Sequence, residues 1–136
     1  MDRKVIDKKI ENLIKKVGSD DLKDIISYLG IKVIKKSDKS FYCQIKDKKY
    51  IYLDKETPDE LQPFILAHEL GHAILHQEEI SHYSPLSITK TATEREADYF
   101  AFKILKKSID PTYDYTSSQY AEMLAVSEDT IKYLIN

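Results

Sequence analysis

The sequence predicts an α+β fold in which helices surround a small, mostly antiparallel three-stranded sheet. Apolar residues recur at helical spacing at both ends of the chain, whereas three short segments in the first half are rich in β-branched and aromatic side chains. A length of 136 residues suits one domain with a core of its own. We therefore expect a single domain, 1–136, made of N-terminal helices (1–30), a sheet (31–53), two further helices (57–107) and a C-terminal helix pair (116–135).

The first half of the chain is predicted to contain two helices and then the sheet. The helix over 3–17 carries its apolar residues at helical spacing and ends at Gly18. Ser19 or Asp20 can cap the next helix, which Gly30 ends. Polar residues separate the segments that follow, and the strands are expected at 31–34, 41–45 and 50–53.

Two longer helices joined by a loop are expected within residues 57–107. A capping-box pattern at 57–60 can start the first of them, and Pro63 then requires either a kink or a restart. This helix is expected to run to about residue 77, and the second from about residue 90 to residue 107. The C-terminal pair follows, with helices near 117–124 and 128–135.

The stretch HELGHAILH, 68–76, carries the strongest chemical signal. Over residues 63–76 the only polar side chains are His68, Glu69, His72 and His76, so this part of the helix is expected to be buried, where ionisable groups need partners or a metal. His68 and His72 are four residues apart and can bind one ion, with Glu69 beside it. This H-E-x-x-H arrangement is typical of zinc peptidases, in which the glutamate is the general base. The alternative is a pair of hydrogen-bonded core histidines.

A third metal ligand is expected from the helix that follows. His76 lies about 12 Å along the helix axis from His68, too far to share one ion, and is predicted to be a supporting or hydrogen-bonded core histidine. Glu94 and Asp98 share a helical face. Glu94 is the candidate ligand, and Asp98 can accept a hydrogen bond from the far nitrogen of a bound histidine. Glu96 lies on another face and is expected to be a solvated acid.

Taken together, these segments resemble the ImmA/IrrE family of metallopeptidases. The matching motifs are A-H-E-L-G-H at 67–72, L-H at 75–76 and E-x-x-A-x-x-F-A at 94–101. The resemblance implies a zincin-like active-site helix, with the two histidines and the later glutamate binding the metal. It also implies a cytoplasmic zinc endopeptidase, associated with mobile genetic elements or stress responses, that cleaves a helix-turn-helix repressor encoded nearby.

Two other functions remain open. The C-terminal pair resembles a helix-turn-helix, which would suit a DNA-binding regulator. Its second helix begins with Glu128 and Asp129, where phosphate contact needs lysine or arginine, so DNA binding is not expected. The other alternative is a metal-dependent interaction module that cleaves nothing.

Further properties follow from composition. No apolar run reaches the ~20 residues that span a bilayer, and a lone Cys43 fits a reducing cytoplasm, so we expect a cytoplasmic protein with no membrane contact. Zinc is the expected cofactor, although Mn²⁺ and Fe²⁺ can occupy the same ligands. Candidate donors to a transition-state oxyanion are His82, Tyr83 and Tyr99.

Overall fold

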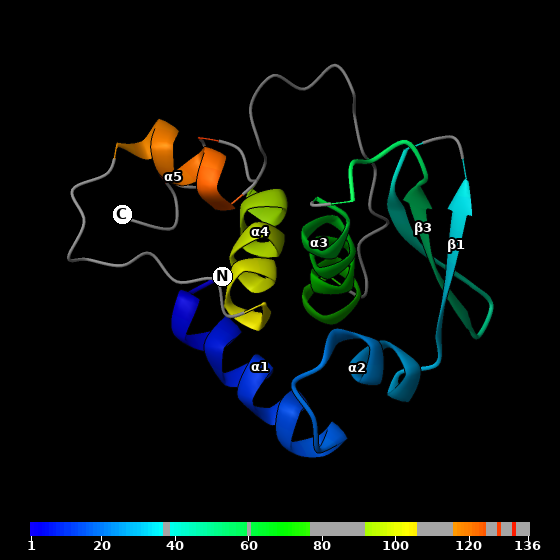
Figure 1. Cartoon of the computed structure of the whole chain (residues 1–136). Coiled ribbons are helices and arrows are strands. Elements are labelled where there is room, and N and C mark those ends of the chain that lie inside the picture. The colour runs from blue at the N-terminus through cyan, green and yellow to red at the C-terminus, as the bar shows by residue number, and fades with distance from the viewer. Residues whose placement is uncertain are drawn as a thin grey trace.

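The fold places two helices before a three-stranded sheet and the remaining helices after it (Figure 1). The structure, a computed structural model, describes residues 1–36, 39–59, 61–76, 92–105 and 116–124, with positions 128 and 132. Its elements are α1 (Arg3–Val17), α2 (Leu22–Tyr28), β1 (Ile31–Lys36), β2 (Phe41–Ile45), β3 (Lys48–Asp54), α3 (Gln62–Leu75), α4 (Ala92–Ile104) and α5 (Ser117–Leu124). The α+β class is therefore confirmed.

The N-terminal helices end as predicted, but α2 begins later. Gly18 and Gly30 follow the two helices with φ of 81° and 69°, a conformation that glycine adopts without a steric penalty. The N-cap of α2 is Asp21, whose carboxylate accepts the N–H of Lys23 at 2.8 Å. Ser19 instead accepts the N–H of Asp21 at 3.1 Å and so holds the cap residue in place.

The sheet is mixed, with the strand order β1-β3-β2. The tight turn after Ile45 makes β2 and β3 antiparallel, as predicted, with Phe41 opposite Tyr52. β1 and β3 are parallel, with Ile31 opposite Lys49, so the expectation of a mostly antiparallel sheet is wrong for this pair. The physical reason is that β3 inserts between β1 and β2, which would otherwise be hairpin neighbours. Strand periodicity does not encode that insertion.

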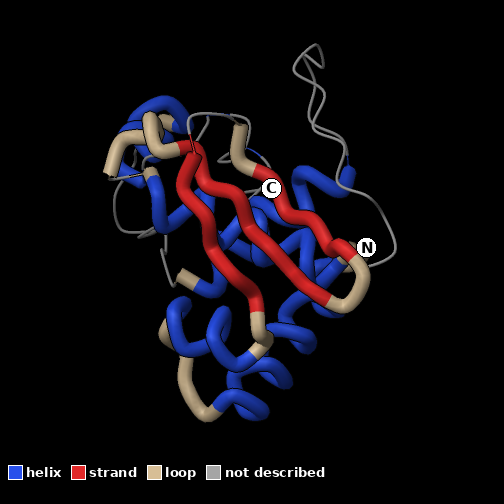
Figure 2. The backbone as a smooth tube through the Cα atoms, turned by 90° about the vertical axis from the view of Figure 1, so that its right-hand side faces the viewer, coloured by secondary structure: helices blue, strands red, loops and turns tan. Residues whose placement is uncertain are grey.

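Helix α3 lies between α4 and the sheet, and it forms the centre of the core (Figure 1). It packs against β2 and β3 on one side and against α4 on the other. Helix α1 packs on α4, and α2 packs on α1 and β1. Figure 2 shows the three strands side by side in front of this helical part. A helix covered in this way needs the nearly all-apolar sequence that α3 has.

Helix α3 starts and ends inside the range predicted for it, and the described part of α4 lies within the predicted 90–107. α3 begins at Gln62, and a separate turn precedes it, in which Leu61 N–H donates to Pro58 O at 2.9 Å. Pro63 therefore restarts the helix and does not kink it. The helix ends at Leu75, with His76 as C-cap.

The C-terminal prediction is tested only for its first helix. α5 forms over Ser117–Leu124. Thr116 and Gln119 cap it reciprocally: Thr116 N–H donates to Gln119 Oε1 at 2.9 Å, and Gln119 N–H donates to Thr116 Oγ1 at 3.2 Å.

Three other predicted features fall outside the described residues: the loop expected at 79–89, the end of the helix near 107 and nearly all of the last helix. Among the helices that are described, none combines the length and apolar character needed to cross a membrane.

Candidate metal centre

The central part of α3 is closed off from solvent. Every residue from 67 to 73 is buried, and the exposed fractions of His68, Glu69 and His72 are 9%, 5% and 3%. Burying an ionisable side chain costs several kcal/mol unless it is paired or bound to a metal. The helix therefore brings three such groups to one place, and α4 and β2 must supply their partners.

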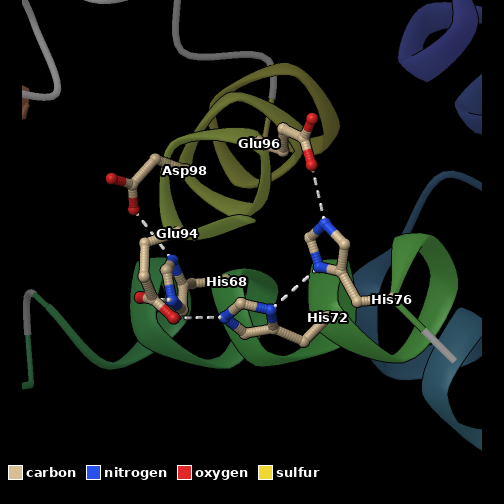
Figure 3. Close-up of polar contacts among 6 residues, drawn as sticks. All are labelled: His68, His72, His76, Glu94, Glu96 and Asp98. Atoms are coloured by element: carbon tan, nitrogen blue, oxygen red, sulfur yellow. Dashed lines mark hydrogen bonds and ion pairs between the residues drawn. The ribbon is translucent and has the colours of Figure 1, made fainter. Parts of the chain in front are cut away.

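Glu94 of α4 reaches both histidines of the H-E-x-x-H motif (Figure 3). Its Oε2 lies 3.0 Å from His68 Nε2, and its Oε1 lies 2.9 Å from His72 Nε2. One ligand atom from each of the three residues falls within 4.8 Å of the others. The structure thus brings together the three residues that the sequence predicts as metal ligands.

The geometry of these atoms fits a divalent metal. His72 Nε2 is buried, and the atom that contacts it is Glu94 Oε1, at 2.9 Å. A metal between these atoms would satisfy the ring nitrogen and the carboxylate together. With bonds of about 2.0–2.1 Å, two ligands of a tetrahedral ion lie about 3.3 Å apart, so the two distances from Glu94 to the histidines need only a small adjustment. The two imidazoles and one carboxylate are the ligand set of a catalytic zinc site.

Asp98 holds His68 from its other side. Its Oδ1 lies 2.8 Å from His68 Nδ1, and its side chain is 1% exposed. Burial alone would lower the pKa of His68, but hydrogen bonds to Asp98 and Glu94 raise it to about 10. Burial would raise the pKa of Glu94, but its contacts with both histidines hold it well below its usual value. In the metal-free protein the cluster is therefore an ion-paired network.

Glu69 lies beside the cluster and is not part of it. Its Oε2 is buried and has no hydrogen-bond partner. Burial raises the pKa of this carboxyl, while His68, His72 and a backbone hydrogen bond from Tyr42 of β2 partly oppose the shift. A raised pKa and a vacant carboxylate oxygen suit a group that accepts and returns a proton.

The third histidine of the HELGHAILH stretch, His76, is paired with Glu96. His76 Nδ1 lies 3.0 Å from His72 Nδ1, and His76 Nε2 lies 2.8 Å from Glu96 Oε1. The expectation that Glu96 is a solvated acid is wrong, because it is only 7% exposed. Its face of α4 turns toward the C-terminal end of α3, where His76 contacts Oε1 and the amino nitrogen of Met1 lies 2.6 Å from Oε2. These contacts hold the pKa of Glu96 below its usual value, against the effect of burial.

The sequence analysis did not predict the contact between His76 and Glu96 or the contact between β2 and Glu69. The four-residue spacing of His72 and His76 could have predicted that these two rings meet, since it places both on one face of the helix. Nothing in the sequence pointed to the backbone of Tyr42 as a partner of Glu69. Of the candidate oxyanion donors, Tyr99 is turned toward α1, where its hydroxyl donates to Asp7 at 2.9 Å. The other two candidates, His82 and Tyr83, lie outside the described residues.

Comparison with curated proteins and with solved structures gave no significant match. A family model described as the IrrE N-terminal-like domain, Peptidase_M78, matches residues 26–133. This range contains the sheet, both helices of the candidate metal site and α5. The match confirms the resemblance seen in the motifs, and the chain belongs to the IrrE N-terminal-like (Peptidase_M78) family.

Proposed function

We propose that this chain is a zinc-dependent endopeptidase. The observation that carries the proposal is the buried Glu69 carboxylate, with one oxygen unpartnered, beside the cluster of His68, His72 and Glu94. A protein that used the histidines only for packing would have no need of a buried acid at position 69. Family membership supports the same reaction class.

Each residue of the cluster has a distinct part in the proposed reaction. His68, His72 and Glu94 hold the metal, which when bound acts as a Lewis acid on the peptide carbonyl and lowers the pKa of water. Asp98 fixes the ring of His68 through Nδ1, which would leave Nε2 to bind the metal. Glu69 takes the proton of the attacking water and gives it to the leaving amine. Its raised pKa suits both transfers, because burial makes the carboxylate a stronger base toward the proton of water than an exposed glutamate would be.

The substrate is proposed to lie along β2. Strand β3 is interior to the sheet, whereas β2 has a described neighbour on one side only. The Tyr42 hydrogen bond places the backbone of β2 next to Glu69. An extended peptide can add to such an edge through main-chain hydrogen bonds, with little demand on its sequence.

Crosslinking tests this placement. A photoreactive residue at Gln44, which is exposed on β2, should capture a peptide substrate bound to the inactive Glu69→Gln variant. The same residue at Lys32, exposed on the opposite edge strand β1, is the matched control. Equal capture from both positions, or capture from Lys32 alone, would place the substrate elsewhere.

The proposed substrate is a cytoplasmic helix-turn-helix repressor encoded near this gene, an expectation that rests on the resemblance alone. The test is to incubate the purified chain with that neighbouring product, with and without a chelator, and to map fragments by mass spectrometry. Cleavage that the chelator abolishes supports the proposal. An intact partner that nonetheless binds the metal-loaded chain would favour the interaction module.

A further inference from the structure

We propose that His76 and Glu96 are positioning residues for His72, acting as a two-residue support for the metal site. The chain of contacts is continuous: His72 Nδ1 to His76 Nδ1 at 3.0 Å, then His76 Nε2 to Glu96 Oε1 at 2.8 Å (Figure 3). All three side chains are buried, with exposed fractions of 3%, 8% and 7%. Water therefore competes little for these hydrogen bonds. The inference rests on the metal site of the proposed function, not on peptide cleavage.

The positions of the hydrogens follow from the contacts. A neutral imidazole has one N–H donor and one acceptor nitrogen. If His72 offers its Nε2 lone pair to a metal, its Nδ1 carries the hydrogen and donates it to His76 Nδ1. That nitrogen is then the acceptor of His76, so the hydrogen of His76 is on Nε2 and is donated to the Glu96 carboxylate. The carboxylate at the end of the chain thus selects one tautomer at each of the two rings.

His68, the other proposed histidine ligand, is also held through Nδ1 by a carboxylate, but without a second histidine in between. His68 Nδ1 meets the Asp98 carboxylate directly at 2.8 Å. Figure 3 shows Asp98 toward His68 and Glu96 toward His76, on different sides of α4. His72 lies between His68 and His76 along α3 (Figure 3). The ring of His76, one turn after His72, connects His72 to Glu96. Both ligand histidines are therefore held through Nδ1 by a carboxylate of α4, one directly and one through a second imidazole.

The unfavourable free energy of burying an ionised Glu96 supports a role for this residue beyond packing. A buried ionised carboxylate is unfavourable unless it is paired, and here it is matched by His76 and the amino nitrogen of Met1. An apolar residue at position 96 would avoid that cost. The acid does, however, provide the acceptor that determines the tautomer of His76, and through it the orientation of His72.

Zinc affinity of the full chain tests the proposal without any assay of cleavage. Competition against a chromophoric chelator should show that His76→Phe, which keeps a ring but removes the acceptor, binds zinc roughly 10–100-fold more weakly than wild type. His76→Gln should recover most of the loss, because its amide oxygen can accept from His72 Nδ1. Glu96→Leu should weaken binding, and Glu96→Gln, whose amide oxygen still accepts from His76, should weaken it less.

A control separates positioning from general loosening of the helix. Ile74→Ala, a partly buried position on α3, should lower stability while leaving zinc affinity near the wild-type value. Histidine ¹⁵N spectra of the zinc-loaded wild type give a direct readout and should show His76 as the Nε2–H tautomer. This readout also decides the matter if His76→Phe fails to fold.

The outcomes distinguish the two proposals. A wild-type chain that binds no divalent metal overturns the proposed function. If the wild-type chain binds zinc but His76→Phe and His76→Gln bind it with equal affinity, the positioning role of His76 and Glu96 is overturned and the proposed function is not. An Nδ1–H tautomer at His76 would also overturn the pair, since it could not then accept from His72.

Discussion

Gly71 of α3 and Ala97 of α4 approach so closely that a methyl group on Gly71 would lie 3.2 Å from Ala97 Cα and 3.3 Å from its carbonyl oxygen. Phe100 Cδ1 would also be 3.2 Å away. Backbone atoms cannot move aside as the end of a flexible side chain can. The glycine therefore sets the distance between the helix that carries His68 and His72 and the helix that carries Glu94.

Gly71→Ala should consequently loosen the metal site. Overpacking costs about 1–3 kcal/mol, and the better helix propensity of alanine returns about 1 kcal/mol, so the free energy of unfolding should fall by about 0–2 kcal/mol. Zinc affinity should fall as well, because the two helices must separate. Urea unfolding with chelator present and zinc competition measure the two effects. Ile74→Ala is the control, since it weakens α3 packing without adding a methyl group. Unchanged zinc affinity in Gly71→Ala would show that the spacing of the helices is not critical.

The ligand set gives a second prediction. Glu94→Ala removes the proposed third ligand, which contacts both histidines, so the protein should retain little zinc after dialysis. Glu96→Ala should still bind about one equivalent at saturating zinc, with weaker affinity, because Glu96 acts only through His76. Metal content by mass spectrometry compares the two variants. If Glu96→Ala loses the metal and Glu94→Ala keeps it, the assignment of the third ligand is wrong.

Glu94 and Glu96 show which features of the site could be predicted from the sequence and which could not. Spacing within one helix is local, so it correctly predicted that His68 and His72 share a face and that Glu94 and Asp98 do. Which α4 faces are covered depends on helices distant in sequence. For that reason the burial of Glu96 against His76 was not foreseen. The parallel pairing of β1 with β3 and the Tyr42 contact with Glu69 are non-local in the same way.

The pH dependence of metal binding follows from His68. Its pKa is raised from 6.5 to about 10 in the metal-free protein, so the ring carries a proton at pH 7–9 that a metal must displace. Zinc binding should release about one proton from this residue, and apparent affinity should rise about tenfold per pH unit below pH 10. Calorimetry in two buffers of different ionisation enthalpy counts the protons. Asp98→Asn, which removes the carboxylate charge that helps to raise this pKa, should release fewer.

Stability of the metal-free protein should show the opposite trend. A folded-state pKa above the unfolded value means that protonated His68 stabilises the fold fully below about pH 6.5, and that this contribution is lost as the pH rises toward 10. With chelator present, the melting temperature should therefore decrease from pH 6.5 to pH 9 in wild type, and by a smaller amount in His68→Gln. Equal slopes in the two proteins would mean that His68 is not the group responsible.

Replacing Glu69 with glutamine separates metal binding from catalysis. The change keeps shape and polarity but removes the base, and Glu69 is not among the grouped ligand atoms, so Glu69→Gln should still bind about one metal ion. Cleavage of a protein partner should fall roughly 10²–10⁴-fold, the usual contribution of a positioned general acid–base. His68→Ala, in contrast, should lose the metal and the stability that its binding adds. If wild type and Glu69→Gln cleave equally well, another carboxylate is the base. If neither cleaves but both bind the partner in a metal-dependent way, the chain acts as an interaction module.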